Sequence, residues 1–502
     1  MTGKIGGRVR WWAAVFAGAL LILAVLAASG RPTVFTDTDD YYALGKELVT
    51  DIGLGPPPPE LSDADIRQAM IDSHMGHTQM ASRSAVYGVY LYAVESAGTL
   101  WLVALTQALA VSWLVLTTWR AAFPAMRLRR AVVAIGVVAA VSPLPFFAGF
   151  AMPDVFAGVV VLAATVLAIF PDRVGRAARW GAWLLLTFAL GVHTSHILFM
   201  VPLIVVAAMV LIWLRVGRRA IVMRVGGLVA ALFVATAANS AYGVLVRIKT
   251  GDTLRNQPFL TARLLADGPG HAYLRHACAT GTPYALCRFK DKPLSDSEDV
   301  LWSDLPKTGV FMLSDYPTRV RLEEQEARFV LGTIAFAPGA QLVASLRNWG
   351  KQLILVYVDD PVRDPVFYLT DPYWKQTNLP NLIGRIAECG KRGTACRPWL
   401  SSRDSRWWHG GMVMAALGVA LVAGVRVRAT TSAANRENDR RLAALVALFT
   451  AGILLNAAVC GILSGPFARY QSRVIWLVPV AAALLVAEWR RRATGGSATR
   501  TA

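Results

Sequence analysis

Ten segments of this sequence are apolar and long enough to span, or nearly span, a lipid bilayer. They cover roughly residues 11–28, 99–119, 131–149, 153–170, 180–193, 196–214, 221–246, 409–425, 442–463 and 474–489. Hydrophobic residues form 55% of the 502-residue chain, which excludes an ordinary soluble domain. Two of these segments match a membrane span less well, because 180–193 is short and 131–149 contains Pro143 and Pro145. We expect an all-α polytopic membrane protein with about ten transmembrane helices.

The basic residues are gathered in the loops on the side of the membrane that holds both termini in a ten-span arrangement. These loops contain 23 Lys and Arg against 4 Asp and Glu, and 23 − 4 = +19 equals the net charge of the whole chain. Because cytoplasmic loops are rich in Lys and Arg, we expect both termini to be cytoplasmic. We therefore expect a multi-pass membrane protein with its large loop on the extracytoplasmic side. The excess of basic residues is explained by membrane topology, so nucleic acid is not expected as a partner.

The first apolar segment allows two interpretations. A basic start, an apolar run and the small residues at 27–29 are also typical of a cleaved signal peptide. An uncleaved first helix is favoured, because nine further segments follow and an even number keeps both termini on one side.

The loops divide the chain into three parts. These are an N-terminal membrane module (1–246) with its first outer loop at 29–98, an extracytoplasmic domain (247–408), and C-terminal membrane helices with a basic cytoplasmic tail (409–502). Within the extracytoplasmic domain, residues 317–332 and 338–358 have helical patterns. The second of these stretches has an apolar face that could rest on the bilayer.

Four of the five cysteines lie in the extracytoplasmic domain, as the close pairs Cys278/Cys287 and Cys389/Cys396. The outer side of the membrane is oxidising, so each pair predicts a local disulfide in an α-rich, disulfide-stapled domain. A zinc site is the alternative. It is disfavoured because the spacings are not Cys-x-x-Cys and no histidine is well placed beside the second pair.

Three carboxylates follow the first apolar segment directly, at Asp37, Asp39 and Asp40. Carboxylates at a membrane edge are often functional, because an apolar wall raises the free energy of an uncompensated charge. The simpler interpretation is a solvated helix start, with Asp37 or Thr38 as the N-cap and acidic residues in the first turn.

Other polar residues lie in the remaining short outer turns. Asp154 follows Met152 and Pro153 at the start of a span, where a capping role is the simpler interpretation. His193 and His196 are three residues apart, which places both imidazoles on one helical face suited to a metal ion or a phosphate. A polar cap at the membrane interface is the alternative.

The last outer turn contains Arg469, Tyr470 and Arg473. Guanidinium groups present a planar fork of donors, so two arginines with a tyrosine could bind a phosphate carried by a lipid. Ordinary interfacial flanking is the alternative, although arginine is disfavoured on the outer side of a membrane.

No nucleotide-binding or hydrolase motif occurs in the sequence. Walker loop, HExxH, GxSxG and Rossmann fingerprints are all absent. A reaction on the outer side without nucleotide needs a substrate that is already activated, and a polyprenyl-phosphate-linked sugar meets that need.

Four short patterns resemble those of the GT-C superfamily of membrane glycosyltransferases. The run DTDDYYALG from Asp37 to Gly45 resembles the D-[ST]-x-x-Y-x-x-L-[AG] run that follows the first helix in that superfamily. Residues 83–87 resemble the approach to its second span, 152–154 its second acidic motif, and 468–470 a late Arg-Tyr motif. The likeness covers roughly residues 10–250 and 440–490. The departures are the lack of an Asp-Glu pair in the first loop, Gly88 in place of the usual Pro, and a large loop that matches nothing familiar.

The resemblance implies a GT-C-like fold and a polyprenyl-phosphate-dependent, inverting sugar transfer. Asp37 would be the general base, with Asp40 next in line and Asp154 orienting the acceptor or a metal ion. Asp39 would face solvent. The residues expected to bind substrate are Arg83, His193, His196, Arg469, Tyr470 and Arg473. No cofactor is implied, although the three carboxylates Asp37, Asp40 and Asp154 could bind a divalent metal ion.

The expected partners are a polyprenyl-phosphate-linked sugar donor, membrane lipids, and a glycan, lipid or protein acceptor in the cell envelope. Two other classes of function stay open. A lipid-linked glycan transporter or flippase would place charged residues deep in several spans, and the sequence shows essentially none. A non-enzymatic envelope assembly protein would use the outer domain and polar turns as an interface.

Overall fold

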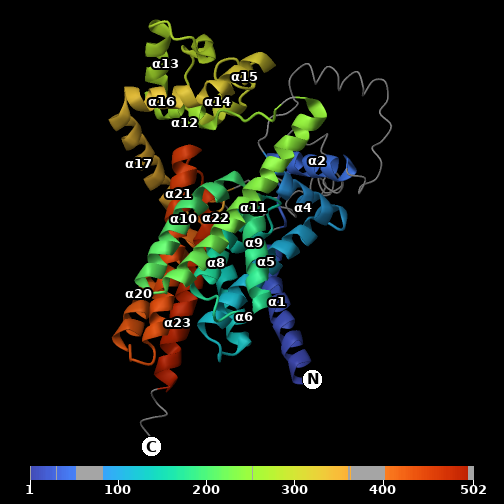
Figure 1. The fold of residues 1–502 in the computed structure, drawn as a ribbon, viewed down its shortest axis with the longest axis vertical. Coiled ribbons are helices and arrows are strands. Elements are labelled where there is room, and N and C mark those ends of the chain that lie inside the picture. Colours follow the sequence, from blue (N-terminus) through green and yellow to red (C-terminus); the bar gives the residue numbers. More distant parts are fainter. Residues whose placement is uncertain are drawn as a thin grey trace, which may run out of the picture.

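The computed structural model describes residues 2–29, 31–51, 83–251, 253–359, 362 and 402–495 (Figure 1). Within these ranges the regular structure is helical, apart from an isolated parallel bridge between Thr33 and Phe150. The beginning of the helix Thr2–Ser29 and the end of the helix Leu477–Gly495 lie at one end of a helical bundle, and the helices between Phe259 and Phe336 lie beyond the other end (Figure 1). This arrangement agrees with the predicted all-α class.

The apolar segments form the helices of the bundle. They are α1 (Thr2–Ser29), α5 (Leu100–Ala122), α6 (Leu128–Val141), α7 (Leu144–Ala148), α8 (Phe156–Ile169), α9 (Arg176–Gly191), α10 (Thr194–Trp213), α11 (Arg218–Thr250), α20 (Ser402–Ala429), α21 (Arg436–Leu463), α22 (Ala468–Ile475) and α23 (Leu477–Gly495). Among the described residues, seven helices are long and apolar enough to cross a membrane, with α22 and α23 together forming one of them. The other three predicted segments contain α6, α8 and α9, of 14, 14 and 16 residues. Membrane-spanning character is therefore supported, whereas ten spans stays a prediction.

The segment 131–149 is interrupted, as its two prolines suggest. Helix α6 ends at Val141, and the short helix α7 begins after Pro143. Ser142 Oγ donates a hydrogen bond of 2.6 Å to the carbonyl of Val138, one turn earlier. Proline lacks a backbone N–H, so α6 cannot continue through this point.

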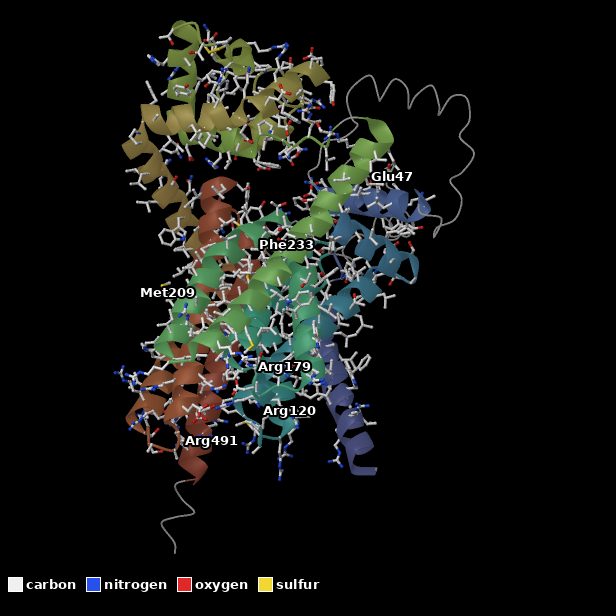
Figure 2. The ribbon with its side chains drawn as sticks, in the orientation of Figure 1. Glu47, Arg120, Arg179, Met209, Phe233 and Arg491 are labelled. Atoms are coloured by element: carbon white, nitrogen blue, oxygen red, sulfur yellow. A yellow bond between two sulfur atoms is a disulfide. The ribbon has the colours of Figure 1, made fainter. Side chains whose placement is uncertain are left out.

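Helix α8 is almost entirely enclosed within the bundle, with Val159 to Ala163 fully buried. Close packing around it depends on small residues. A Cβ atom on Gly158 would lie 2.5 Å from the ring of Trp476, which is itself fully buried. By contrast, Met209 on α10 and Phe233 on α11 are 55% and 72% exposed on the outside of the bundle (Figure 2). Large apolar side chains exposed on long apolar helices suit contact with lipid.

The predicted extracytoplasmic domain has a core of its own among its described residues. Its helices are α12 (Phe259–Asp267), α13 (Pro269–Ala279), η2 (Ala285–Phe289), α14 (Ser297–Trp302), α15 (Tyr316–Glu324), α16 (Glu326–Phe336) and α17 (Pro338–Ile354). Leu274, Phe289 and Phe329 belong to this core. The predicted disulfide Cys278–Cys287 is confirmed and joins α13 to η2. The predicted pair Cys389/Cys396 lies outside the described residues.

Helix α17 connects this domain to the bundle. Trp349 Nε1 donates a hydrogen bond of 3.1 Å to the carbonyl of Leu454 on α21. Gln352 binds the backbone of Phe467 through both ends of its amide, at 2.8 and 3.0 Å. Leu342 and Val343 are 60% and 65% exposed. Whether this apolar surface rests on the bilayer, as predicted for 338–358, stays a prediction.

The orientation of the bundle gives a direct prediction. Arg120, Arg179 and Arg491 lie toward the end of the bundle that holds both termini (Figure 2). We expect an impermeant thiol reagent, applied to intact cells, to label Ser295→Cys in the outer domain and to leave Ser432→Cys unmodified. Both positions are exposed, so accessibility of the side chain does not limit the reaction. Labelling at 432 with protection at 295 would reverse the orientation.

Candidate functional site

Asp37 and Asp40 lie at the start of α2 (Thr36–Asp51) and face one arginine. Arg83 Nη2 donates a hydrogen bond of 2.5 Å to Asp37 Oδ1, and Arg83 Nε lies 3.6 Å from Asp40 Oδ2. Acidic residues are favourable in a first helical turn, which explains why α2 begins here. Asp37 is 19% exposed and Asp40 is 48% exposed, so a partly enclosed ion pair lies beside a more open carboxylate.

Helix α2 is held in place by a close contact with α4 (Ala85–Ser96). A Cβ on Gly45 would lie 2.0 Å from the carbonyl oxygen of Gly88, and a Cβ on Gly88 would lie 2.7 Å from the carbonyl oxygen of Tyr41. The two helices can therefore touch only because both positions are glycine. This contact gives a structural reason for Gly88, which replaces the proline expected from the resemblance.

Asp154 is the centre of a second, more deeply buried ion cluster. It lies in the short helix η1 (Pro153–Val155), with its side chain 3% exposed. Asp154 Oδ1 is 3.4 Å from Arg473 Nη1 and 3.8 Å from Arg469 Nε, so a single carboxylate faces two guanidinium groups. Taken alone, this cluster has two guanidinium groups for one carboxylate.

Arg473 is fully buried and fully bound by the protein. Its Nε and Nη2 donate to Asn456 Oδ1 at 3.2 and 3.0 Å, and Nη2 also lies 3.0 Å from Ser195 Oγ and 3.2 Å from Cys460 Sγ. With Nη1 on Asp154, all three nitrogens of the guanidinium bind protein atoms. Arg473 thus joins η1, α10, α21 and α22, and this geometry favours a structural role over the predicted contact with phosphate.

Arg469 is arranged differently. Its guanidinium lies 4.3 Å from the ring centre of Phe35 and 5.1 Å from that of Tyr470, and its side chain is 13% exposed. Nη2 donates a long hydrogen bond of 3.4 Å to the Tyr470 hydroxyl. Nη1 is buried and has no hydrogen-bond partner among the described residues. A buried cationic N–H without an acceptor is costly, so this edge of Arg469 is suited to an anionic ligand.

The two ion clusters lie side by side. Thr33 forms two backbone hydrogen bonds with the residues on either side of Phe150. Its N–H donates to the carbonyl of Gly149, and its carbonyl accepts from the N–H of Ala151, each at 2.9 Å. Thr38 Oγ1 then donates to the carbonyl of Ala151 at 3.1 Å. These bonds hold the start of α2 against the segment that leads to Asp154.

As a result, Asp37 lies within electrostatic range of Arg469. The fold therefore brings together Asp37, Arg83, Asp154 and Arg469, which are far apart in the sequence.

The two histidines adopt separate structural roles. His193 is the N-cap of α10, and its Nδ1 accepts hydrogen bonds from Ser195 N at 3.1 Å and from Ser195 Oγ at 2.8 Å. His196 is fully buried, and its Nδ1 donates to the carbonyl of Ala189 at 2.6 Å. The polar-cap interpretation thus agrees with the geometry of His193, while Ser195 links the cap to Arg473.

The prediction that Asp39 faces solvent is wrong. Asp39 is 7% exposed, whereas its neighbour Asp40 points outward. Loss of solvation raises the pKa of Asp40 to about 6, and although Arg83 opposes this shift, the charges of Asp37 and Asp39 add to it. Asp40 therefore takes up a proton close to neutral pH, which makes it a second candidate for a general base.

Two residues near the site were missed by sequence reasoning, Trp302 and Glu298 on α14. The Arg83 guanidinium lies 6.0 Å from the ring centre of Trp302. Glu298 is exposed and within electrostatic range of both Arg469 and Asp37. No local sequence pattern distinguishes Trp302 or Glu298 as a site residue. Their role is indicated only by the position of the outer domain next to the site.

The carboxylates predicted for a divalent metal ion are arranged for guanidinium groups instead. Asp37 and Asp40 face Arg83, and Asp154 faces two arginines. Within the part of the chain that the structure describes, no group of three or more His, Cys, Asp or Glu side chains could hold a metal ion. The residues at this site do not fit the predicted metal.

The chain matches no protein-family model, no curated protein and no solved structure. What the site does must therefore be inferred from its own geometry and chemistry.

Proposed function

We propose that this protein is a membrane glycosyltransferase of the GT-C type. It would move a sugar from a polyprenyl-phosphate donor to a cell-envelope acceptor at the extracytoplasmic side of a bacterial inner membrane. The observation that carries this proposal is a partly exposed carboxylate, Asp37, within electrostatic range of Arg469, whose Nη1 has no hydrogen-bond partner among the described residues. A carboxylate beside an anion-binding arginine is what a base-assisted transfer from a phosphate requires.

The geometry of Asp37 suits a general base. Arg83 and Thr36 both donate to Oδ1, which leaves Oδ2 without a hydrogen-bond partner among the described residues. Arg83 can thus fix the orientation of the carboxylate while Oδ2 accepts the proton of an acceptor hydroxyl. The acceptor oxygen then forms a bond to the anomeric carbon, and the bond between that carbon and the phosphate oxygen breaks.

The leaving lipid phosphate takes the electron pair and gains negative charge. Arg469 is positioned to stabilise that charge through Nη1, since the site is partly shielded from water. The guanidinium is held in place by an ion pair with Asp154 and by a cation–π contact with the ring of Phe35. Arg473, whose three guanidinium nitrogens all bind protein atoms, positions Asp154 and does not touch the donor.

The proposal can be tested with purified protein in lipid nanodiscs. We would add a panel of synthetic polyprenyl-phosphate hexoses and pentoses and measure free polyprenyl phosphate by mass spectrometry. Release above that of protein-free nanodiscs is expected for at least one sugar. A flippase would instead move the intact donor across a liposome membrane without cleaving it, and an assembly protein would do neither.

Replacing Arg469 gives a specific prediction. Arg469→Ala should weaken the use of donor by roughly 2–4 kcal/mol, as expected when one partner of a buried charge pair is lost. Arg469→Lys should recover only part of this, because an ammonium group lacks the planar fork of donors. The measurement is the donor concentration dependence of polyprenyl phosphate release.

The control for this prediction is Arg275→Ala, which removes an exposed arginine of the outer domain. It should retain wild-type donor dependence. Equal donor dependence in Arg469→Ala and Arg275→Ala would remove Arg469 from the phosphate site.

A further inference from the structure

Helix α14 of the extracytoplasmic domain presents an aromatic residue to the proposed active site. Trp302 is 37% exposed, although tryptophan has a large, mainly apolar side chain. Its ring contacts among the described residues are loose, with Arg83 at 6.0 Å and the ring of Phe259 at 6.2 Å between centres. Phe259 is itself 36% exposed. Two partly exposed aromatic rings therefore lie beside the arginine that orients Asp37.

The position of α14 is fixed by bonds to the membrane helices. Arg263 Nη1 lies 3.3 Å from Ser297 Oγ, at the start of α14, and 3.4 Å from the carbonyl of Ser464, at the end of α21. Arg263 is in turn paired with Asp267, whose side chain is fully buried. Asp267 also accepts from Asn348 on α17, at 2.8 Å. This hydrogen-bond network fixes α14 relative to the membrane helices and therefore holds Trp302 near the site.

Glu298 lies one helical turn before Trp302, so both side chains lie on one face of α14. It is exposed, and loss of solvation followed by the charge of Asp296 raises the pKa of Glu298. Arg469 opposes this shift and Asp37 adds to it, which places Glu298 near both residues. An aromatic ring thus lies near Arg83, and a carboxylate on the same helix lies within electrostatic range of Asp37.

We propose that Trp302 and Glu298 form the acceptor subsite and that the acceptor is a glycan chain. This inference rests on the proposed function and narrows its acceptor to one class. A sugar ring has an apolar C–H face and a rim of hydroxyl groups. Trp302 stacks on the C–H face, and Glu298 accepts hydrogen bonds from the rim. The sugar held there presents a hydroxyl to Asp37 Oδ2.

The first test measures how the enzyme divides its donor between a glycan and water. With a donor that turns over, products are quantified as glycosylated acceptor and as free sugar. The acceptors are hexasaccharides of defined linkage built from mannose, glucose, galactose or arabinose. Trp302→Ala should lower the ratio of transfer to hydrolysis by about 10-fold or more, with Trp302→Phe intermediate because a smaller ring still stacks.

Glu298→Gln should also lower this ratio, and its matched control is Asp299→Asn, an exposed neighbour on the same helix. Trp407→Ala is the control for tryptophan, since Trp407 is 75% exposed on α20. A ratio in Trp302→Ala equal to that in Trp407→Ala would overturn the acceptor subsite and leave the proposed transferase activity standing.

The second test measures binding of the same hexasaccharides, without donor, to the protein in nanodiscs by surface plasmon resonance. Wild-type protein should bind at least one of them, and Trp302→Ala should bind it at least 10-fold more weakly. Binding that does not depend on Trp302, or no binding at all, would overturn the proposal. If binding depends on Trp302 but no donor turns over, the glycan site stands and the transferase function fails.

Discussion

Asp37→Asn is expected to reduce sugar transfer by roughly 10²–10⁴-fold while the protein stays folded. Asparagine retains the shape of the side chain, and its oxygen can still accept from Arg83, which lies 2.5 Å from Asp37 Oδ1. The amide nitrogen that replaces Oδ2 cannot take up a proton, so the base is lost. Transfer would be measured as polyprenyl phosphate release at saturating donor, with folding checked by thermal unfolding in detergent.

The controls for this variant lie on the same helix. Glu47→Gln removes a carboxylate from the solvent-facing side of α2 and should leave transfer unchanged (Figure 2). Asp40→Asn separates the two candidate bases, because Asp40 is the more exposed and has the raised pKa. An inactive Asp40→Asn beside an active Asp37→Asn would assign the base to Asp40. Asp39→Asn is no neutral control, since Asp39 is buried.

Arg473→Met should destabilise the protein by roughly 3–5 kcal/mol, because it leaves buried partners without a donor. The side chain is fully buried, and its loss frees the oxygens of Asp154, Asn456 and Ser195. The change would be measured as a lower midpoint of thermal unfolding in detergent. Arg469→Met, which removes a partly exposed arginine with weaker contacts, should lower the midpoint less.

A double variant separates two causes of the destabilisation in Arg473→Met, the unpaired buried charge and the loss of packing. Arg473→Met combined with Asp154→Leu removes both charges and should regain part of the lost stability. If Arg473→Met instead folds as well as wild type but uses donor poorly, Arg473 belongs to the phosphate site and the structural role is wrong.

Several features of this protein follow from local sequence. The apolar segments become helices because a backbone in lipid must satisfy its own hydrogen bonds. Pro143 predicts the interruption between α6 and α7, and the spacing of Cys278 and Cys287 predicts the observed disulfide. Asp37 and Asp154 lie in first helical turns, as the sequence suggests. Each of these features depends on neighbours within a few residues, so no knowledge of the fold is needed.

The individual roles of the charged residues depend on distant segments. Arg469 and Arg473 are one helical turn apart. Among the described residues, Nη1 of Arg469 has no hydrogen-bond partner, whereas Nη2 of Arg473 donates to residues of α10 and α21. Asp39 and Asp40 are adjacent, yet one is buried and the other exposed.

Sequence alone determined the helical membrane architecture and the outer turns in which polar residues gather. Only the tertiary structure decided which guanidinium nitrogen lacks a hydrogen-bond partner among the described residues, which carboxylate is more exposed, and that α14 places Trp302 beside Arg83. The physical reason is that a buried charge must be paired, and its partners come from segments hundreds of residues away, as Asp154 does for Arg473.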